Sequence, residues 1–166
     1  RIERFDVDAV PNADTMALSL RVVLPGQLSE GYSVRFLLND LMLAQVPVRE
    51  VEGRSVAEYV VGLALVERWW PAGEGERPLH VVAAEVVAPN GDVIAKTQRT
   101  TGFRSVELRQ VADTIGTSFT FCVNGREIFM KGCNVVPPSM VPIYDAPWLK
   151  LVVQMHQAGM NMARVW

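Results

Sequence analysis

The chain has 166 residues, enough for one domain or for one small domain plus part of another. Hydrophobic residues make up 49% of it and charged residues 20%, which is typical of a folded protein that buries a core. The net charge of −2 provides no basic stripe for phosphates and no apolar run approaches the roughly 18 residues that cross a bilayer, so we expect neither a nucleic-acid partner nor a membrane span.

Residues 1–109 alternate apolar and polar side chains in short runs closed by turn residues, as half-buried antiparallel strands do. The runs occupy residues 4–10, 16–24, 33–38, 41–48, 55–66, 79–88 and 93–108, the last broken near residue 101. Asn90-Gly91 favours a two-residue hairpin, because both residues accept positive φ. About seven short strands in about 100 residues predict an immunoglobulin-like antiparallel β-sandwich.

Residues 110–166 follow a different pattern. Residues 118–123 and 127–130 flank Asn124-Gly125 and predict a second hairpin. Residues 131–134 could continue its second strand. Prolines between positions 137 and 142 argue against regular structure. Asp145 is expected to cap a helix of about 13 residues that Gly159 ends, and residues 160–166 form another apolar run of strand length.

Strand, helix and strand make a βαβ unit, which requires parallel pairing and builds an α/β sheet or barrel. Two strands and one helix cannot cover both faces of a parallel sheet. Either these residues pack on the sandwich or they need a further partner. We therefore expect the residues after about Arg109 to be less ordered, or to be held by a neighbouring copy.

Paired carboxylates are the first candidates for hydrolysis, because glycoside cleavage needs an acid and a nucleophile or base. The pairs with suitable spacing are Asp6/Asp8, Glu50/Glu52 and Glu74/Glu76. All are expected on solvated faces or loops, as charged residues normally are. His80 and His156 lack a nucleophile-elbow context and are expected to be structural. Residues 73–75 lack the rest of a phosphate loop and are expected to form a turn.

Metal and cofactor sites are not expected. Cys122 and Cys133 cannot form a disulfide framework and lack the paired spacing of a zinc site, so small buried hydrophobes are the better interpretation. The start at Arg1, without an initiator methionine or signal-peptide pattern, is interpreted as an internal cut. The compartment, cytoplasmic or secreted, and the oligomeric state stay open.

Four stretches along the chain carry a resemblance when taken together. They read Trp-Trp-Pro-Ala-Gly-Glu-Gly at 69–75, Gly-Phe-Arg-Ser-Val-Glu-Leu at 102–108, Phe-Cys-Val-Asn-Gly-Arg-Glu-Ile-Phe-Met-Lys-Gly-Cys-Asn at 121–134 and Asn-Met-Ala-Arg-Val-Trp at 161–166. In this order and spacing they resemble glycoside hydrolase family 2, and the first and last are most similar to its β-mannosidases. The resemblance implies a loop and the last strand of an immunoglobulin-like domain, then the opening hairpin and second strand of a catalytic (β/α)₈ barrel.

By this resemblance the parent is a retaining exo-glycosidase that removes a terminal β-linked mannose. Residues 1–109 would be its sandwich and residues 110–166 the truncated start of its barrel: a hairpin, one helix and one strand. A full barrel takes about 250 residues, of which this chain would hold roughly a fifth. The two catalytic glutamates would lie on later strands, so the chain itself is expected to hold no catalytic residue and to be inactive and structural.

The resemblance also implies part of a sugar pocket made by Asn134, Arg164 and Trp166. Trp166 resembles a tryptophan beside the cleaved sugar and Arg164 an arginine that supports the site, and a stacking indole and a charged donor suit sugar recognition. In the other interpretation, Arg164 is a buried structural ion and Trp166 a frayed end. The family usually has tryptophan after Asn134, where Val135 stands here, so the sugar specificity stays open. A rival hypothesis is a free-standing immunoglobulin-like module that binds carbohydrate or protein.

Overall fold

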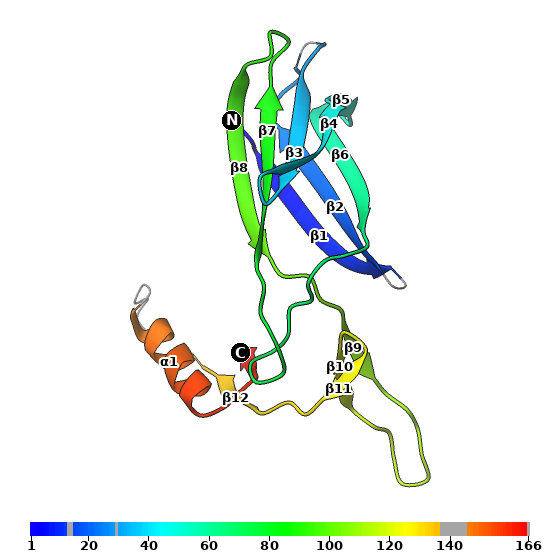
Figure 1. Cartoon of the computed structure of the whole chain (residues 1–166), viewed down its shortest axis with the longest axis vertical. Helices are drawn as coiled ribbons and strands as arrows, with labels where there is room; N and C mark the ends of the chain where they lie inside the picture. Colours follow the sequence, from blue (N-terminus) through cyan, green and yellow to red (C-terminus); the bar gives the residue numbers. More distant parts are fainter. Residues whose placement is uncertain (13–14, 29, 137–145, 166) are drawn as a thin grey trace. The chain divides into compact units, whose positions relative to one another are not determined.

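The computed structural model describes residues 1–12, 15–28, 30–136 and 146–165 (Figure 1). The described chain is mainly β and divides into two compact units. The first comprises Arg1–Glu67 and Pro78–Arg104, and the second comprises Arg68–Arg77 and Ser105–Trp166. A loop that lies between two sandwich strands in sequence therefore belongs to the second unit.

The first unit consists of two four-stranded antiparallel sheets, with the strand orders β1-β2-β6-β5 and β4-β3-β7-β8. The strands are β1 (Arg4–Asn12), β2 (Thr15–Leu24), β3 (Ser33–Leu38), β4 (Leu41–Pro47), β5 (Arg49–Val51), β6 (Arg54–Leu63), β7 (His80–Val87) and β8 (Val93–Thr101). This strand order is that of an immunoglobulin sandwich. The expected antiparallel strands are confirmed, whereas β5 was not predicted, because three residues are too short for an alternation to show.

The core of the sandwich comes from alternate residues of both sheets. Leu18, Leu20 and Val22 of β2 face Val34 and Phe36 of β3, and none of them is more than 1% exposed. The Phe36 ring stacks on two other rings of this core, with centroid distances of 6.4 Å to Phe5 and 6.3 Å to Tyr59. Burial of each such side chain contributes about 1.5–3 kcal/mol, so the first unit has a core of its own.

The turn at Asn90-Gly91 differs from the prediction. The Gly91 N–H donates to the Ala88 carbonyl and the Ala88 N–H to the Asp92 carbonyl, both at 2.9 Å, so the loop has three residues. Gly91 takes positive φ (90°) and Asn90 does not. Pro89 explains the difference, because its fixed φ suits the first central position of a type I turn, which a left-handed residue then completes.

The second unit begins with a three-stranded antiparallel sheet in the order β11-β10-β9. Its strands are β9 (Val106–Arg109), β10 (Thr120–Val123) and β11 (Arg126–Ile128). Asn124 and Gly125 both have positive φ, 52° and 80°, which confirms the predicted two-residue hairpin. The run over 93–108, predicted to break near residue 101, forms two strands there, β8 and β9, and β9 pairs with β10.

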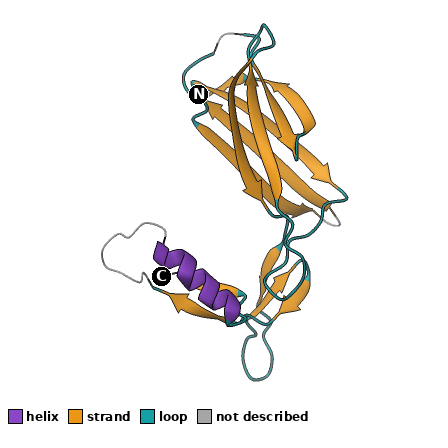
Figure 2. Ribbon diagram, turned by 60° about the vertical axis from the view of Figure 1, so that its left-hand side comes forward, coloured by secondary structure: helices purple, strands orange, loops and turns teal. Residues whose placement is uncertain are grey.

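The chain then forms β12 (Gly132–Val135), α1 (Ala146–Gln157) and β13 (Met162–Val165). β12 pairs with β13 in parallel, as the βαβ interpretation requires. Residues 132–135 form a separate strand, so the possible continuation of the hairpin strand through residues 131–134 is not realised. Figure 2 shows this helix, in purple, within the second unit. Among the described residues, no helix has the length and apolar character needed to cross a membrane.

The helix α1 ends as the sequence predicts. Gly159 has a φ of 71°, its N–H donates to the His156 carbonyl, and the Met160 N–H donates to the Met155 carbonyl, both at 3.0 Å. This is a Schellman motif. The expected cap, Asp145, lies outside the described residues. Leu149 and Val152 are 69% and 59% exposed, so α1 keeps an uncovered apolar face within its unit.

The loop over Arg68–Arg77 is held by the turn of the β10–β11 hairpin. The side-chain amide of Asn124 donates to the Trp69 carbonyl at 3.0 Å, and its oxygen accepts from the Ser105 N–H at 3.0 Å. Arg126 lies over the Trp70 ring, 4.3 Å from its centroid, and pairs with the Glu74 carboxylate at 3.1 Å. The stretches at residues 69–75 and 121–134, both identified in the sequence, are therefore in contact.

We expect Phe36→Ala to destabilise the sandwich by about 3–5 kcal/mol, because it removes a fully buried ring that stacks on two others. Urea unfolding followed by far-UV circular dichroism measures the change. Val60→Ala, at a side chain that is 65% exposed, is the control and should change stability by less than about 0.5 kcal/mol. Equal losses in the two variants would contradict the assignment of the core.

Arg126→Ala should loosen the Arg68–Arg77 loop, because the cation–π contact and the ion pair are lost together. If these contacts contribute about 1–2 kcal/mol, their loss raises the population of molecules in which the loop is detached roughly 5- to 30-fold. The rate at which a glutamate-specific protease cleaves after the exposed Glu76 should rise by the same factor. Arg99→Ala, at an exposed cation on β8, should leave the rate unchanged, and an unaltered rate in Arg126→Ala would refute the contact's role.

Candidate functional site

The parallel strand pair brings together two of the three residues that the sequence analysis assigned to a sugar pocket. Asn134 of β12 lies directly opposite Arg164 of β13 in the register. The Arg164 Nη1 donates to the Asn134 Oδ1 at 3.2 Å. Both residues are exposed, so Arg164 is not a buried structural ion. Trp166 lies outside the described residues, directly after β13 in the chain.

The positions of Asn134 and Arg164 along their strands determine which hydrogen bonds the two residues can offer a ligand. Asn134 and Arg164 lie in the carboxyl-terminal halves of β12 and β13, because both strands run in the same direction. A guanidinium has five N–H donors, and a carboxamide has a donor as well as an acceptor. One contact between them uses a small part of this capacity, so a polyhydroxylated ligand would find donors and an acceptor at one edge of the sheet.

The amino ends of the two strands are held by a residue to which the sequence analysis gave no role of its own, Asn161. Its Oδ1 accepts from the Lys131 N–H at 2.8 Å, and its Nδ2 donates to the Phe129 carbonyl at 3.0 Å. Its backbone N–H donates to the Lys131 carbonyl at 2.8 Å. Asn161 lay within the predicted strand 160–166, and its partners lie about 30 positions away in the sequence, so no local signal marked its role.

The carboxylates considered as candidates occupy separate and solvated environments. Asp6 pairs with Arg4 at 2.7 Å, Glu50 accepts from the Gln27 amide at 3.0 Å, and Glu74 belongs to the loop contact with Arg126. These are exposed or half-exposed groups with ordinary neighbours. No cluster of three or more metal-ligating side chains occurs among the described residues.

The two histidines and the two cysteines lie in different surroundings. The His80 Nδ1 accepts from the Asn39 amide at 3.0 Å, and the His80 ring lies 5.0 Å from the ring of Phe103. His156 lines an apolar groove of about 530 Å³ beside the amino end of β13. Cys122 is buried and Cys133 is half-buried, and neither forms a disulfide.

One arginine of the second unit has a pKa that is raised by its surroundings. Arg109 of β9 lies near Cys122, Glu107 and Glu127, and its electrostatic interaction with Cys122 raises its pKa most, followed by the interactions with Glu107 and Glu127. Its Nη1 contacts the Glu127 carboxylate at 2.9 Å across the sheet. Arg109, like any arginine, is positively charged at physiological pH, and it pairs with Glu107 on its own strand and with Glu127 on β11.

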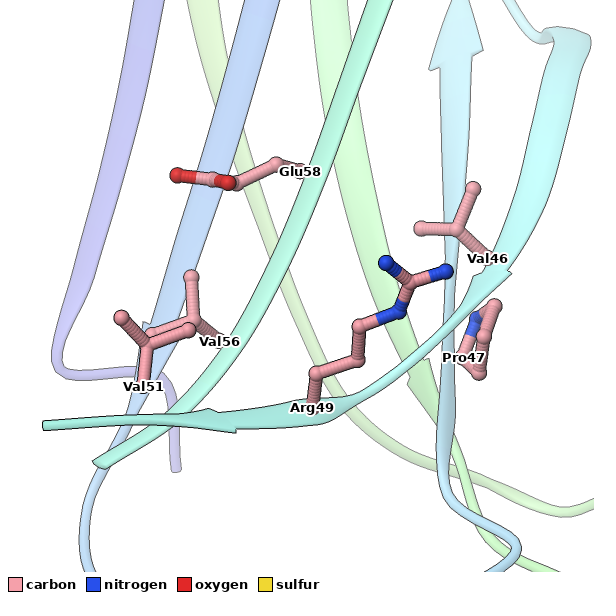
Figure 3. A pocket seen from close by; sticks show the side chains of 6 residues that line it. All are labelled: Val46, Pro47, Arg49, Val51, Val56 and Glu58. Atoms are coloured by element: carbon pink, nitrogen blue, oxygen red, sulfur yellow. The ribbon is translucent and has the colours of Figure 1, made fainter. Parts of the chain in front are cut away.

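The sandwich carries a small hollow of its own, shown in Figure 3. It has a volume of about 150 Å³ and is lined by Val46, Pro47, Arg49, Val51, Val56 and Glu58. In Figure 3 the Arg49 guanidinium lies between Glu58 and Val46. Glu58 pairs with Arg21 at 3.0 Å. None of the residues predicted for a sugar pocket lines this hollow, so we do not assign the site to it.

Known proteins resemble the chain over most of its length. β-Mannosidase B of Aspergillus niger is 30% identical over 169 residues, which cover 97% of this chain and 19% of that protein. β-Mannosidase A of Aspergillus oryzae is 31% identical over 128 residues, covering 70% and 14%. The chain thus spans at most about a fifth of the length of these relatives. No family model matches the chain.

Solved structures show the same relationship in the fold. The β-D-mannosidase of Dictyoglomus thermophilum superposes on the whole chain with a TM-score of 0.81 and 25% identity, over 21% of its own length. The exo-chitosanase CsxA of Amycolatopsis orientalis has a TM-score of 0.74 at 17% identity, which supports the fold alone, over 20% of its length. On these grounds, the chain belongs to glycoside hydrolase family 2 and resembles the β-mannosidases of that family.

Proposed function

We propose that this chain supplies the sandwich and the barrel opening of a retaining exo-glycosidase that hydrolyses terminal β-linked sugars, with β-mannosides as the substrate class. In this proposal residues 1–109 form the immunoglobulin-like domain, and residues 110–166 open the catalytic (β/α)₈ barrel with a hairpin, one helix and one strand. The chain itself is structural and does not catalyse. Relatives about five times as long, named as β-mannosidases, support the proposal.

The parallel unit β12-α1-β13 supports the barrel assignment. Strand, helix and parallel strand is the repeat from which such barrels are built, and the helices form the outer ring. Leu149, Val152 and Val153 of α1 are exposed apolar residues. In a complete barrel, neighbouring strands and helices would cover such residues. A sheet of two parallel strands is likewise too small to bury its faces.

The observation that carries the proposal is the contact between Asn134 and Arg164 in the carboxyl-terminal halves of two parallel strands. Active sites of these barrels are built at the carboxyl ends of the strands. Hydrogen bonds between a charged donor and sugar hydroxyls are stronger than neutral ones, and Arg164 would provide them. Trp166, which lies outside the described residues, would supply a stacking surface for the sugar.

Three acids of the described second unit are engaged in ion pairs. Retaining glycosidases use two carboxyl groups about 5–5.5 Å apart on either side of the scissile bond. Glu107 and Glu127 pair with Arg109 on the three-stranded sheet, and Glu74 pairs with Arg126 in the loop. The proposal therefore places the acid and the nucleophile on later barrel strands.

The purified 166-residue chain should not hydrolyse 4-nitrophenyl β-mannoside or β-galactoside, because it lacks the carboxyl pair. Release of 4-nitrophenol measures activity, and a β-mannosidase under the same conditions is the positive control. Turnover by the chain that disappears on a single substitution within it would place catalytic residues here and contradict the proposal. Saturable binding of mannosides by the chain alone would favour the rival hypothesis of an autonomous binding module.

In a polypeptide extended to the length of the relatives, Arg164→Lys and Asn134→Ala should each lower kcat/KM for 4-nitrophenyl β-mannoside. Loss of one hydrogen bond to the sugar, from the guanidinium fork or from the neutral amide, corresponds to about 0.5–1.5 kcal/mol, or roughly 2- to 10-fold. Arg99→Gln on β8, which removes an exposed cation from the sandwich, is the matched control and should keep full activity. Unchanged kinetics in both site variants would remove Asn134 and Arg164 from the pocket.

A further inference from the structure

The candidate site depends on the register between β12 and β13, and no turn sets that register. Antiparallel strands joined by a tight hairpin inherit their register from the turn. Parallel strands are joined by a long crossover, here through α1, and a crossover leaves the relative shift of the two strands undetermined. Some other contact must therefore determine which residue of β13 lies opposite Asn134.

Asn161 makes such a contact at the amino ends of the strands. Its side-chain amide is satisfied on both sides, by the Lys131 N–H and the Phe129 carbonyl, two residues apart on the segment that leads into β12. A carboxamide with one acceptor and one donor fits this pair of backbone groups in a single position along the segment. The hydrogen bonds from the Asn161 and Met162 N–H groups to the Lys131 carbonyl, at 2.8 and 3.2 Å, reinforce that position.

A steric contact next to Asn161 favours the same position. A Cβ at Gly132 would collide with the carbonyl of Met162, so the two strands begin closer together than any side chain at position 132 would allow. Gly132 lies opposite Met162 in the register. The close approach brings the segment around Lys131 within reach of the short Asn161 side chain.

We propose that Asn161 is the positioning residue of the candidate site, and that its side chain sets the parallel register that places Arg164 opposite Asn134. Asn161 lies three positions before Arg164 in the chain and acts through the strand. A slip of one residue would bring Ala163 or Val165 opposite Asn134 and turn the Arg164 side chain to the other face of the sheet. The functional meaning of this register rests on the proposed function, but the register itself does not.

A disulfide trap in the 166-residue chain tests the register directly. Cys133 lies opposite Ala163, and neighbouring strands are about 4.8 Å apart, which is within the range that a disulfide spans. In a Cys122→Ala background, the Ala163→Cys variant should form an intramolecular disulfide with Cys133 under mild oxidation. The Arg164→Cys variant should form little disulfide with Cys133, because position 164 is one residue further along β13 and its side chain lies on the opposite face of the sheet. Thiol titration and mass spectrometry of proteolytic fragments measure the yields.

Substitutions at Asn161 then show what holds the register. Asn161→Ala should lower the yield of the 133–163 disulfide at least five-fold and raise the 133–164 yield, since both side-chain hydrogen bonds are lost. Asn161→Asp keeps the acceptor for the Lys131 N–H and should retain an intermediate yield. Asn90→Ala is the matched control, because it also removes an asparagine oxygen bonded to a backbone N–H, but in the first unit.

Each outcome of the trap has a defined meaning. A 133–163 yield that Asn161→Ala leaves unchanged, with far-UV circular dichroism like that of the parent chain, would overturn the role of Asn161. Absence of the 133–163 disulfide in the chain with Asn161 intact would overturn the register itself. No sugar enters this experiment, so its failure is distinguishable from that of the proposed function, which the kinetics of the extended polypeptide test.

Discussion

The parallel pairing of β12 with β13 is the constraint on which the candidate site depends. It joins residues about 30 positions apart and is the reason that Asn134 meets Arg164. Parallel strands gain slightly less from their hydrogen bonds than antiparallel strands do, and this pair has four residues on each side. Contacts outside the ladder therefore matter more here than in the sandwich, and the side chain of Asn161 provides them.

The two units differ in how much of their apolar surface they bury. The sandwich buries its own apolar residues between two sheets and needs no other part of the chain to complete its core. The second unit has short strands and one helix, and many of its large apolar side chains remain exposed, among them Phe119, Phe129, Leu149 and Val165. Apolar surface on this scale is typical of an interaction site, and the proposed barrel would cover it.

The Arg68–Arg77 loop contains the motif at residues 69–75, and it contacts the motif at residues 121–134, which lies about 50 residues later in the sequence. It leaves the sandwich after β6 and returns at β7, yet its contacts are with the turn of the β10–β11 hairpin. Gly75 is required beside Trp70, because a Cβ there would meet the indole at 2.9 Å. Arg126 then covers the same ring, so aromatic, glycine and arginine positions depend on one another.

The sequence by itself determined the elements whose signals are local. Alternation marked the long sandwich strands, Asn124-Gly125 marked a hairpin because both residues accept positive φ, and Gly159 marked the end of α1. It also singled out Asn134 and Arg164, through a resemblance of the stretches that contain them. Prediction failed at Asn90-Gly91, where Pro89 favours a different turn.

Only the tertiary structure decided which distant segments lie side by side. Residues 132–135 have the composition of a strand that could extend the hairpin or leave it, and no local preference separates these outcomes. The choice follows from hydrogen bonds with β13, about 30 residues later, which a local pattern cannot contain. The same holds for Asn161 and Arg126, because the residues that they contact lie about 30 and 50 positions away in the sequence.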